Sequence, residues 1–400
     1  MRKLILYSLF VFLLIGCGGG GSGNSGVVKI ISDAQEVAYK SDSQDWSKSF
    51  KNKKDLNNGV KEYSIEAYGK YKIALKCSND SYYLIALNAK SDKEFNFNCP
   101  FTALGLSVTI NGSINDSVDG LNNFIVANKT DYEFVGSANS YTLQTVADNS
   151  SDILAITHNN AIPKRFIAIR DKKISAINKT FNIDFTNSNS VEIKSKAYNL
   201  AGQTIGDIFL VTKNRTYFKS SLGNFWYYPS GLLLDSDYFV FTHYISANSV
   251  FRVKNIQAKA LEKKDYTIDL SYIKPLNSLS YSGNKIKALN SYSPSDKSQK
   301  FRGYIIDLEN SNLNRDLHIM VSNDYLNGDS DFAIDDLSQI AGFEAAWSGA
   351  GATKVEAAAI MSSLKLGVLM QTEHFLHIKK FEHFPFKEDS TIEVATQTLK

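Results

Sequence analysis

Three histidines near the C-terminus form the densest group of metal-ligand side chains in the sequence. Their spacing is His374-x-x-His377-x5-His383, with Glu373 and Glu382 beside them. Positions i and i+3 of a β-strand lie on opposite faces, so His374 and His377 could share a cation only on a helix. The aromatic residues and the proline of this segment disfavour a helix. We therefore predict histidines in exposed strands and turns, and no metal site.

A second segment with possible metal chemistry runs from Asn323 to Asp331 and reads NDYLNGDSD. Its oxygen-bearing side chains and its glycine are typical of calcium loops. If Gly328 takes the turn position of a twelve-residue calcium loop, Tyr325 and Ile334 fall at positions that need oxygen ligands. The spacing therefore favours an ordinary acidic turn, and calcium binding near Asp329 remains the alternative.

Cys77 and Cys99 are candidates for a disulfide. Each ends a run of alternating apolar and polar residues, YKIALKC and EFNFNC, which places both sulfurs on buried faces of strands. In an oxidising compartment we expect them to form a bridge, which a chain-entropy model values at about 3 kcal/mol. Two buried free thiols are the alternative, because pairing also needs the right separation.

Four consecutive aromatic residues, Phe225 to Tyr228, precede Pro229. On an extended strand two of them point to one face and two to the other. Only one pair can then fill the core of its own module, and the other pair faces away from it. If Trp226 and Tyr228 are that pair, they either pack against a neighbouring module or form a platform on which a sugar ring stacks. The packing interpretation is favoured, because a neighbouring domain covers large apolar surfaces more often than a ligand does.

Motifs of catalysis are not found. The sequence has no nucleophile elbow, and the glycines around Trp347 lack the Gly-Lys-Ser/Thr of a phosphate loop. His158 and His243 end matching strands and are better explained by duplication than as two bases. We expect no catalytic residues and no cofactor.

The N-terminus has the three parts of a secretory signal. Arg2 and Lys3 precede the apolar run Leu4 to Leu14, which is too short to span a bilayer. Leu14-Ile15-Gly16-Cys17 resembles the bacterial lipoprotein lipobox, which implies cleavage after residue 16, lipidation of Cys17 and attachment through several acyl chains. The Gly/Ser-rich residues 17–26 form a flexible tether. Gly18 stands where an aspartate would mark inner-membrane retention, which by the same resemblance favours the outer membrane.

Composition limits the partners. Cleavage removes Arg2 and Lys3, which leaves 42 of the 44 basic residues against 41 acidic ones. Lysines are scattered and form no basic patch, so we expect no nucleic-acid partner. The membrane, through the lipid, and an unknown protein or glycan of the envelope are the expected partners.

An internal repeat organises the chain. Asp152–His158 matches Asp237–His243, and Phe181–Phe185 matches Tyr266–Leu270, both at an offset of 85 residues. A constant offset across two strands indicates duplicated modules. Short alternating strands between polar turns predict an all-β fold of tandem β-sandwiches, immunoglobulin-like or prealbumin-like. The expected boundaries are residues 27–104, 105–190 and 191–275 for three sandwich modules and 276–400 for a C-terminal β-rich module.

The C-terminal module is expected to contain a short helical insertion. Asp335 or Asp336 can cap a helix in which four apolar residues recur at near-helical spacing: Leu337, Ile340, Phe343 and Trp347. The apolar run Val355–Leu366 could be helix or strand, and the glycines before it favour strand.

The lipobox, the tether and the repeated modules together resemble bacterial outer-membrane lipoproteins built of tandem immunoglobulin-like or carboxypeptidase-regulatory-like sandwiches. This resemblance covers nearly the whole chain and implies a lipid-anchored envelope protein, facing the periplasm or the cell surface. It carries over no functional residue beyond Cys17. The expected function is a non-enzymatic spacer, adhesion or interaction scaffold, and the alternative is a glycan- or polymer-binding accessory lipoprotein.

Overall fold

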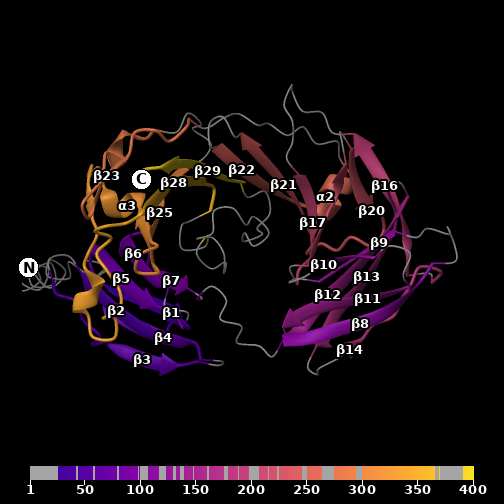
Figure 1. Cartoon of the computed structure of the whole chain (residues 1–400), viewed down its shortest axis with the longest axis horizontal. Coiled ribbons are helices and arrows are strands. Elements are labelled where there is room, and N and C mark those ends of the chain that lie inside the picture. Colours follow the sequence, from indigo (N-terminus) through magenta and orange to yellow (C-terminus); the bar gives the residue numbers. More distant parts are fainter. Residues whose placement is uncertain are drawn as a thin grey trace, which may run out of the picture.

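The computed structural model is an all-β protein (Figure 1). It describes residues 26–364, 369 and 391–400, apart from gaps at 42–43, 57–58, 79–80, 98, 100–106, 117–122, 129–131, 136–138, 147, 160–161, 175–178, 188, 198–206, 215, 223–224, 246–249, 264–273 and 294–299. Cys17, the three C-terminal histidines and Tyr266 lie outside the described residues.

The first strand group forms two facing layers. Its strands are β1 (Val27–Ser32), β2 (Glu36–Ser41), β3 (Asn52–Asp55), β4 (Lys61–Glu66), β5 (Lys70–Lys76), β6 (Tyr82–Asn88) and β7 (Glu94–Phe97). In one layer β1 pairs antiparallel with β4 and parallel with β7, and β3 pairs with β4. In the other layer β5 lies between β2 and β6. Their alternating apolar side chains meet between the layers in one core.

The second and third strand groups repeat these pairings. The second group comprises β8 (Ser107–Asn115), β9 (Asn123–Ala127), β10 (Tyr132–Val135), β11 (Ser140–Val146), β12 (Asp148–Asn159), β13 (Ile162–Ile174), β14 (Lys179–Thr180) and β15 (Ile183–Asp184). The third comprises β16 (Val191–Ala197), β17 (Asp207–Val211), β18 (Tyr217–Lys219), β19 (Ser221–Leu222), β20 (Phe225–Pro229), β21 (Tyr238–Ile245) and β22 (Val250–Gln257), followed by α2 (Ala258–Lys263). The chain β10-β9-β12-β13 corresponds to β18-β17-β21-β22, and the pair β8·β11 to β16·β20. The sequence repeat is therefore also a repeat of strand pairing.

The C-terminal group adds a four-stranded antiparallel layer and an irregular cover. Its elements are β23 (Ser280–Ser282), β24 (Lys285–Lys287), η2 (Leu289–Ser291), β25 (Lys300–Asn310), β26 (Arg315–Ser322), α3 (Asn323–Leu326), β27 (Phe332–Ala333), η3 (Leu337–Gln339), β28 (Lys354–Ser362) and β29 (Thr391–Thr398). The order in the layer is β29-β28-β25-β26. The strand expected in the Val355–Leu366 run is β28.

The sheets do not stop at the boundaries expected between modules. The C-terminal layer joins the first group through the parallel pair β6·β26 and the third group through the antiparallel pair β22·β29, which makes one eleven-stranded sheet. The pair β13·β16 joins the second group to the third in a seven-stranded sheet. In Figure 1 the groups accordingly follow an arc in the order first, C-terminal, third and second.

The fused sheets explain strands that are apolar on both faces. Tyr83, Ile85 and Leu87 of β6 point into the core of the first group. Their alternates, Tyr82, Leu84 and Ala86, pack under the C-terminal group. A strand buried on both faces is stable only inside a sheet, because an exposed edge would leave its backbone groups unpaired. The sheets therefore run across the junctions between the tandem sandwiches that the sequence predicts.

The prediction of a helix after Asp335 is wrong. Asp336 does act as a cap, since its carboxylate accepts a hydrogen bond from the Ser338 amide at 3.1 Å, but only the 3-10 turn η3 follows. Leu337, Ile340 and Phe343 are buried over the eleven-stranded sheet. Their apolar spacing reflects this irregular cover rather than one face of a helix.

Cys77 and Cys99 are joined by a disulfide in the structure, with their Cα atoms 5.6 Å apart. Cys77 directly follows β5, and Cys99 lies shortly after β7, so the bridge links the two layers of the first group. Both residues belong to the core between those layers.

A buried ion pair holds the second and third groups together. Arg170 of β13 donates two hydrogen bonds of 2.8 Å to the carboxylate of Asp237, which precedes β21 and is fully buried. Its guanidinium also lies 3.8 Å from the buried carboxylate of Asp152. Asp152 and Asp237 are equivalent residues of the 85-residue repeat. One arginine therefore neutralises the same buried position of two successive modules.

No helix among the residues described above has the length and hydropathy of a membrane span.

Replacing Asp237 by alanine tests this junction. The variant leaves the Arg170 guanidinium buried without its bidentate partner, so the free energy of unfolding should fall by about 3–5 kcal/mol. The control is Asp207→Ala, which removes the exposed ion pair with Lys219 and should cost less than about 1 kcal/mol. Urea titration followed by circular dichroism measures both. Equal losses in the two variants would contradict the assignment.

Candidate functional site

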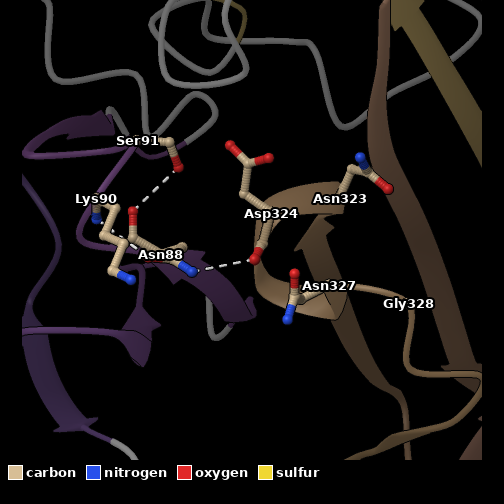
Figure 2. A pocket seen from close by; sticks show the side chains of 7 residues that line it. All are labelled: Asn88, Lys90, Ser91, Asn323, Asp324, Asn327 and Gly328. Atoms are coloured by element: carbon tan, nitrogen blue, oxygen red, sulfur yellow. Dashed lines mark hydrogen bonds between the residues drawn. The ribbon is translucent and has the colours of Figure 1, made fainter.

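A polar pocket lies where the first group meets the C-terminal group (Figure 2). Its volume is about 480 Å³. We call it the junction pocket and define it by its lining residues, which are Asn88, Lys90, Ser91, Asn323, Asp324, Asn327 and Gly328. In Figure 2 the end of β6 and the turn after it form one wall, α3 and the turn after it form the other, and the carboxylate of Asp324 points into the space between them.

The parallel pairing of β6 with β26 brings these walls together. Val321 lies opposite Ala86 in the register, so the strands end side by side at Ser322 and Asn88. The carboxyl ends of parallel strands share one edge of a sheet, which is also the edge where ligands bind in open α/β sheets. Turns that are more than 200 residues apart in the sequence thereby face each other.

The C-terminal wall has a defined local structure. The hydroxyl of Ser322 caps α3 by accepting a hydrogen bond from the Tyr325 amide at 3.0 Å. Asn327 then adopts the left-handed conformation (φ 48°), which asparagine tolerates better than most residues, and its amide donates to the Asn323 carbonyl at 2.9 Å. Leu326 is buried and anchors the turn. Asn323 and Asp324 are left exposed on the pocket side.

The wall from the first group is a tight turn that starts at Asn88. The Asn88 carbonyl accepts hydrogen bonds from the amides of Ser91 and Asp92, at 3.0 and 2.9 Å. Its side-chain oxygen accepts from the Lys90 amide at 3.0 Å, as in an Asx turn. Its side-chain amide donates across the pocket to the Asp324 carbonyl at 3.1 Å. Asn88 therefore shapes its own wall and holds the opposite one.

Lysine contacts fasten the junction beside the pocket. Lys70, which is paired with Asn88 in the β5·β6 ladder, forms an ion pair with Asp329 at 2.5 Å. Its ammonium also lies 5.3 Å from the centre of the Tyr325 ring. Lys40 and Lys72 both bind the carboxylate of Asp335, Lys72 at 2.5 Å.

The charges of the site are balanced. Lys90 and Asp324 are exposed on opposite walls. Arg302 lies nearby. Burial lowers the pKa of its guanidinium below the ordinary value, and the negative charges of Asp324 and Asp92 oppose part of this shift. With amides, a hydroxyl, an ammonium and a carboxylate, the lining both donates and accepts hydrogen bonds. Such a surface suits a ligand that carries both hydrogen-bond donors and hydrogen-bond acceptors.

The ligand platform, which was the alternative interpretation for Trp226 and Tyr228, is not available. Trp226 is only 4% exposed and Tyr228 only 6%. Their rings stack at 4.7 Å, and Trp226 meets Phe239 of β21 edge-on at 4.9 Å. Their core also contains residues of the second group, such as Phe166. The platform interpretation is therefore wrong, and the two rings pack between modules.

The acidic turn Asn323–Asp331 is occupied by other contacts. Asp329 binds Lys70, and the Asp331 carboxylate accepts from the Ser330 hydroxyl at 3.0 Å. Within the described part of the chain, no three or more His, Cys, Asp or Glu side chains lie close enough to hold a metal ion. The same turn instead contributes Asn323, Asp324 and Asn327 to the junction pocket.

His158 lies at the end of β12 and is 9% exposed. Burial lowers the pKa of its imidazole to about 4, against a small opposing effect of a backbone hydrogen bond at Ile156. Among the residues that the structure describes, its Nδ1 has no hydrogen-bond partner. The side chain is therefore neutral at pH 7. Within the described part of the chain, no nucleophilic side chain is hydrogen-bonded to it.

Searches against protein-family models and against curated proteins each gave no match. The turn Asn323–Asp331, which forms one wall of the pocket, stands out in the sequence as an acidic turn, whereas the wall at Asn88 was not predicted. The available signal was the pair of runs YYLIALN and LHIMVS, each apolar on both faces and each followed by a polar turn.

Trp226→Ala tests the packing of the aromatic strand. Removal of a fully buried ring should lower the free energy of unfolding by about 3–5 kcal/mol. Phe225→Ala is the control, because that neighbouring ring is 48% exposed and its loss should cost less than about 1 kcal/mol. Denaturant unfolding distinguishes the two. A Trp226→Ala variant as stable as the control would show that the ring is not part of the core.

The pKa of His158 predicts a dependence of stability on pH. Its folded pKa is about 4 and the ordinary value is 6.5, so between these values the unfolded chain binds the proton and the folded chain does not. This group therefore destabilises the fold as the pH falls from about 6.5 to 4, by up to about 3 kcal/mol. His158→Gln should remove that part of the acid sensitivity. Urea titrations of both proteins at pH 7 and pH 4.5 should show a smaller loss in the variant, and parallel losses would refute the prediction.

Proposed function

We propose that this protein is a lipid-anchored, non-enzymatic scaffold of the bacterial cell envelope, which holds an interaction surface at a set distance from the membrane. The observation that carries the proposal is the continuity of the sheets across all four strand groups. Shared strand pairing, shared cores and the Arg170–Asp237 ion pair restrict hinge motion between the groups. A body without hinges can present partners in a defined geometry.

The anchor rests on the sequence. Residues 1–16 act as the signal peptide, Cys17 carries the lipid, and residues 17–26 form the tether. A glycine-rich tether of this length behaves as a flexible coil spanning roughly 15–20 Å. The absence of an aspartate after Cys17 supports attachment to the outer membrane, on either its periplasmic or its outer side.

We propose that residues 27–104, 105–190 and 191–275 are prealbumin-like rather than immunoglobulin-like sandwich units, with residues 276–400 completing the body. In an immunoglobulin sandwich the first, second, fourth and fifth strands share a sheet. Here β1 and β4 pair in one layer while β2 and β5 pair in the other, and β8, β11, β9 and β12 repeat this arrangement. The repeated pairing supports duplication of one unit.

The alternative function, a glycan- or polymer-binding accessory lipoprotein, loses its original basis with the burial of Trp226 and Tyr228. Any ligand role must use another surface.

The Cys17→Ala variant tests the anchor. It should appear in the soluble fraction, or as uncleaved precursor, with an unchanged circular dichroism spectrum, because lipid is the only proposed attachment. Retention of the variant in washed membranes would contradict the proposal. Protease treatment of intact cells that make the natural protein then distinguishes an outward-facing body, which is cleaved, from a protected periplasmic one.

A further inference from the structure

The junction pocket contains polar side chains that the fold does not use. In the described part of the structure, no hydrogen bond or ion pair occupies the Lys90 ammonium, the Asp324 carboxylate or the side-chain amides of Asn323 and Asn327. By contrast, Lys70, Lys40 and Lys72 beside the pocket all have carboxylate partners. The four unused side chains lie together on the surface of one pocket.

The chemistry of these groups indicates the ligand. Amide side chains donate and accept at the same time, as a sugar hydroxyl does, and the carboxylate and the ammonium add a strong acceptor and a strong donor. A phosphate or another anion would need an excess of positive charge. Here Asp324 and Asp92 offset Lys90 and Arg302. The balance favours a neutral, polyhydroxylated ligand.

Position and size agree with this chemistry. The pocket lies at the carboxyl ends of a parallel strand pair and between two strand groups, both common places for small-ligand sites. Its volume of about 480 Å³ is within the range of roughly 300–1,000 Å³ typical of such sites. Both walls are held from behind, by the Asn88–Asp324 hydrogen bond and by the Lys70–Asp329 ion pair, so little ordering is needed when a ligand binds.

We propose that the junction pocket binds a neutral saccharide unit, with Asp324, Asn323, Asn327 and Lys90 forming hydrogen bonds to its hydroxyl groups. This site is independent of the lipid anchor and goes beyond the scaffold function. It gives the rigid body a ligand at the seam between its first and last strand groups.

Saturation-transfer NMR on the purified full chain tests the proposal. The detergent should lack a sugar head group, and the probes are glucose, galactose, mannose and N-acetylglucosamine, with glucuronate and glucosamine as charged comparators. At least one neutral sugar should bind with a Kd in the millimolar range. Glucuronate and glucosamine should bind more weakly than that sugar.

Two variants tie the binding to the pocket. Asp324→Ala should weaken binding at least tenfold with an unchanged melting temperature, because the side chain is exposed. Asp45→Ala removes an exposed aspartate of the first group outside the pocket and should stay within twofold of the natural chain. The proposal is overturned if no neutral sugar binds, if a charged comparator binds most tightly, or if Asp324→Ala binds as well as Asp45→Ala. None of these outcomes bears on membrane attachment, which the Cys17→Ala fractionation tests separately.

Discussion

The parallel pairing of β6 with β26 is the constraint on which the arrangement of this protein depends. β6 buries six of its seven residues, with large apolar side chains on both faces, and such a strand cannot form the edge of a sheet. β26 supplies the missing backbone partners, and the cover of the C-terminal group buries the second face. The first and last parts of the chain are therefore one structural unit, and the junction pocket exists because the two strands end together.

The second and third strand groups are joined by a different set of contacts. β13 pairs antiparallel with β16 within one sheet, and Leu154 and Ile156 of β12 share a core with the aromatic residues of β20. The ion pair between Arg170 and Asp237 fixes how the two groups align at this apolar contact, because its two hydrogen bonds can form in only one register. Apolar area supplies most of the stability at these seams, and the buried ion pair favours one arrangement of the modules.

Local features of the fold were predictable from the sequence. The 85-residue offset identified corresponding strands such as β12 and β21, and alternation placed Cys77 and Cys99 on faces of the same core. Local patterns could not show that β6 is completed by a strand more than 200 residues later, because periodicity reports which faces are buried and not by what. The same limit applies to the site. The Asn323–Asp331 turn was visible as a polar loop, but its partner at Asn88 depends on the non-local pairing.

The order in which the strands are made has a consequence for folding. Synthesis from the N-terminus produces β6 long before β26, so the apolar edge of β6 stays unpaired until the last strand group is made. Exposed edges of this kind pair with other chains and aggregate. The disulfide between Cys77 and Cys99 closes within the first group alone and keeps its two layers together during this interval. The first strand group therefore has an open sheet edge until the C-terminal group folds. Pairing of β26 with β6 closes that edge and removes the site at which other chains could pair.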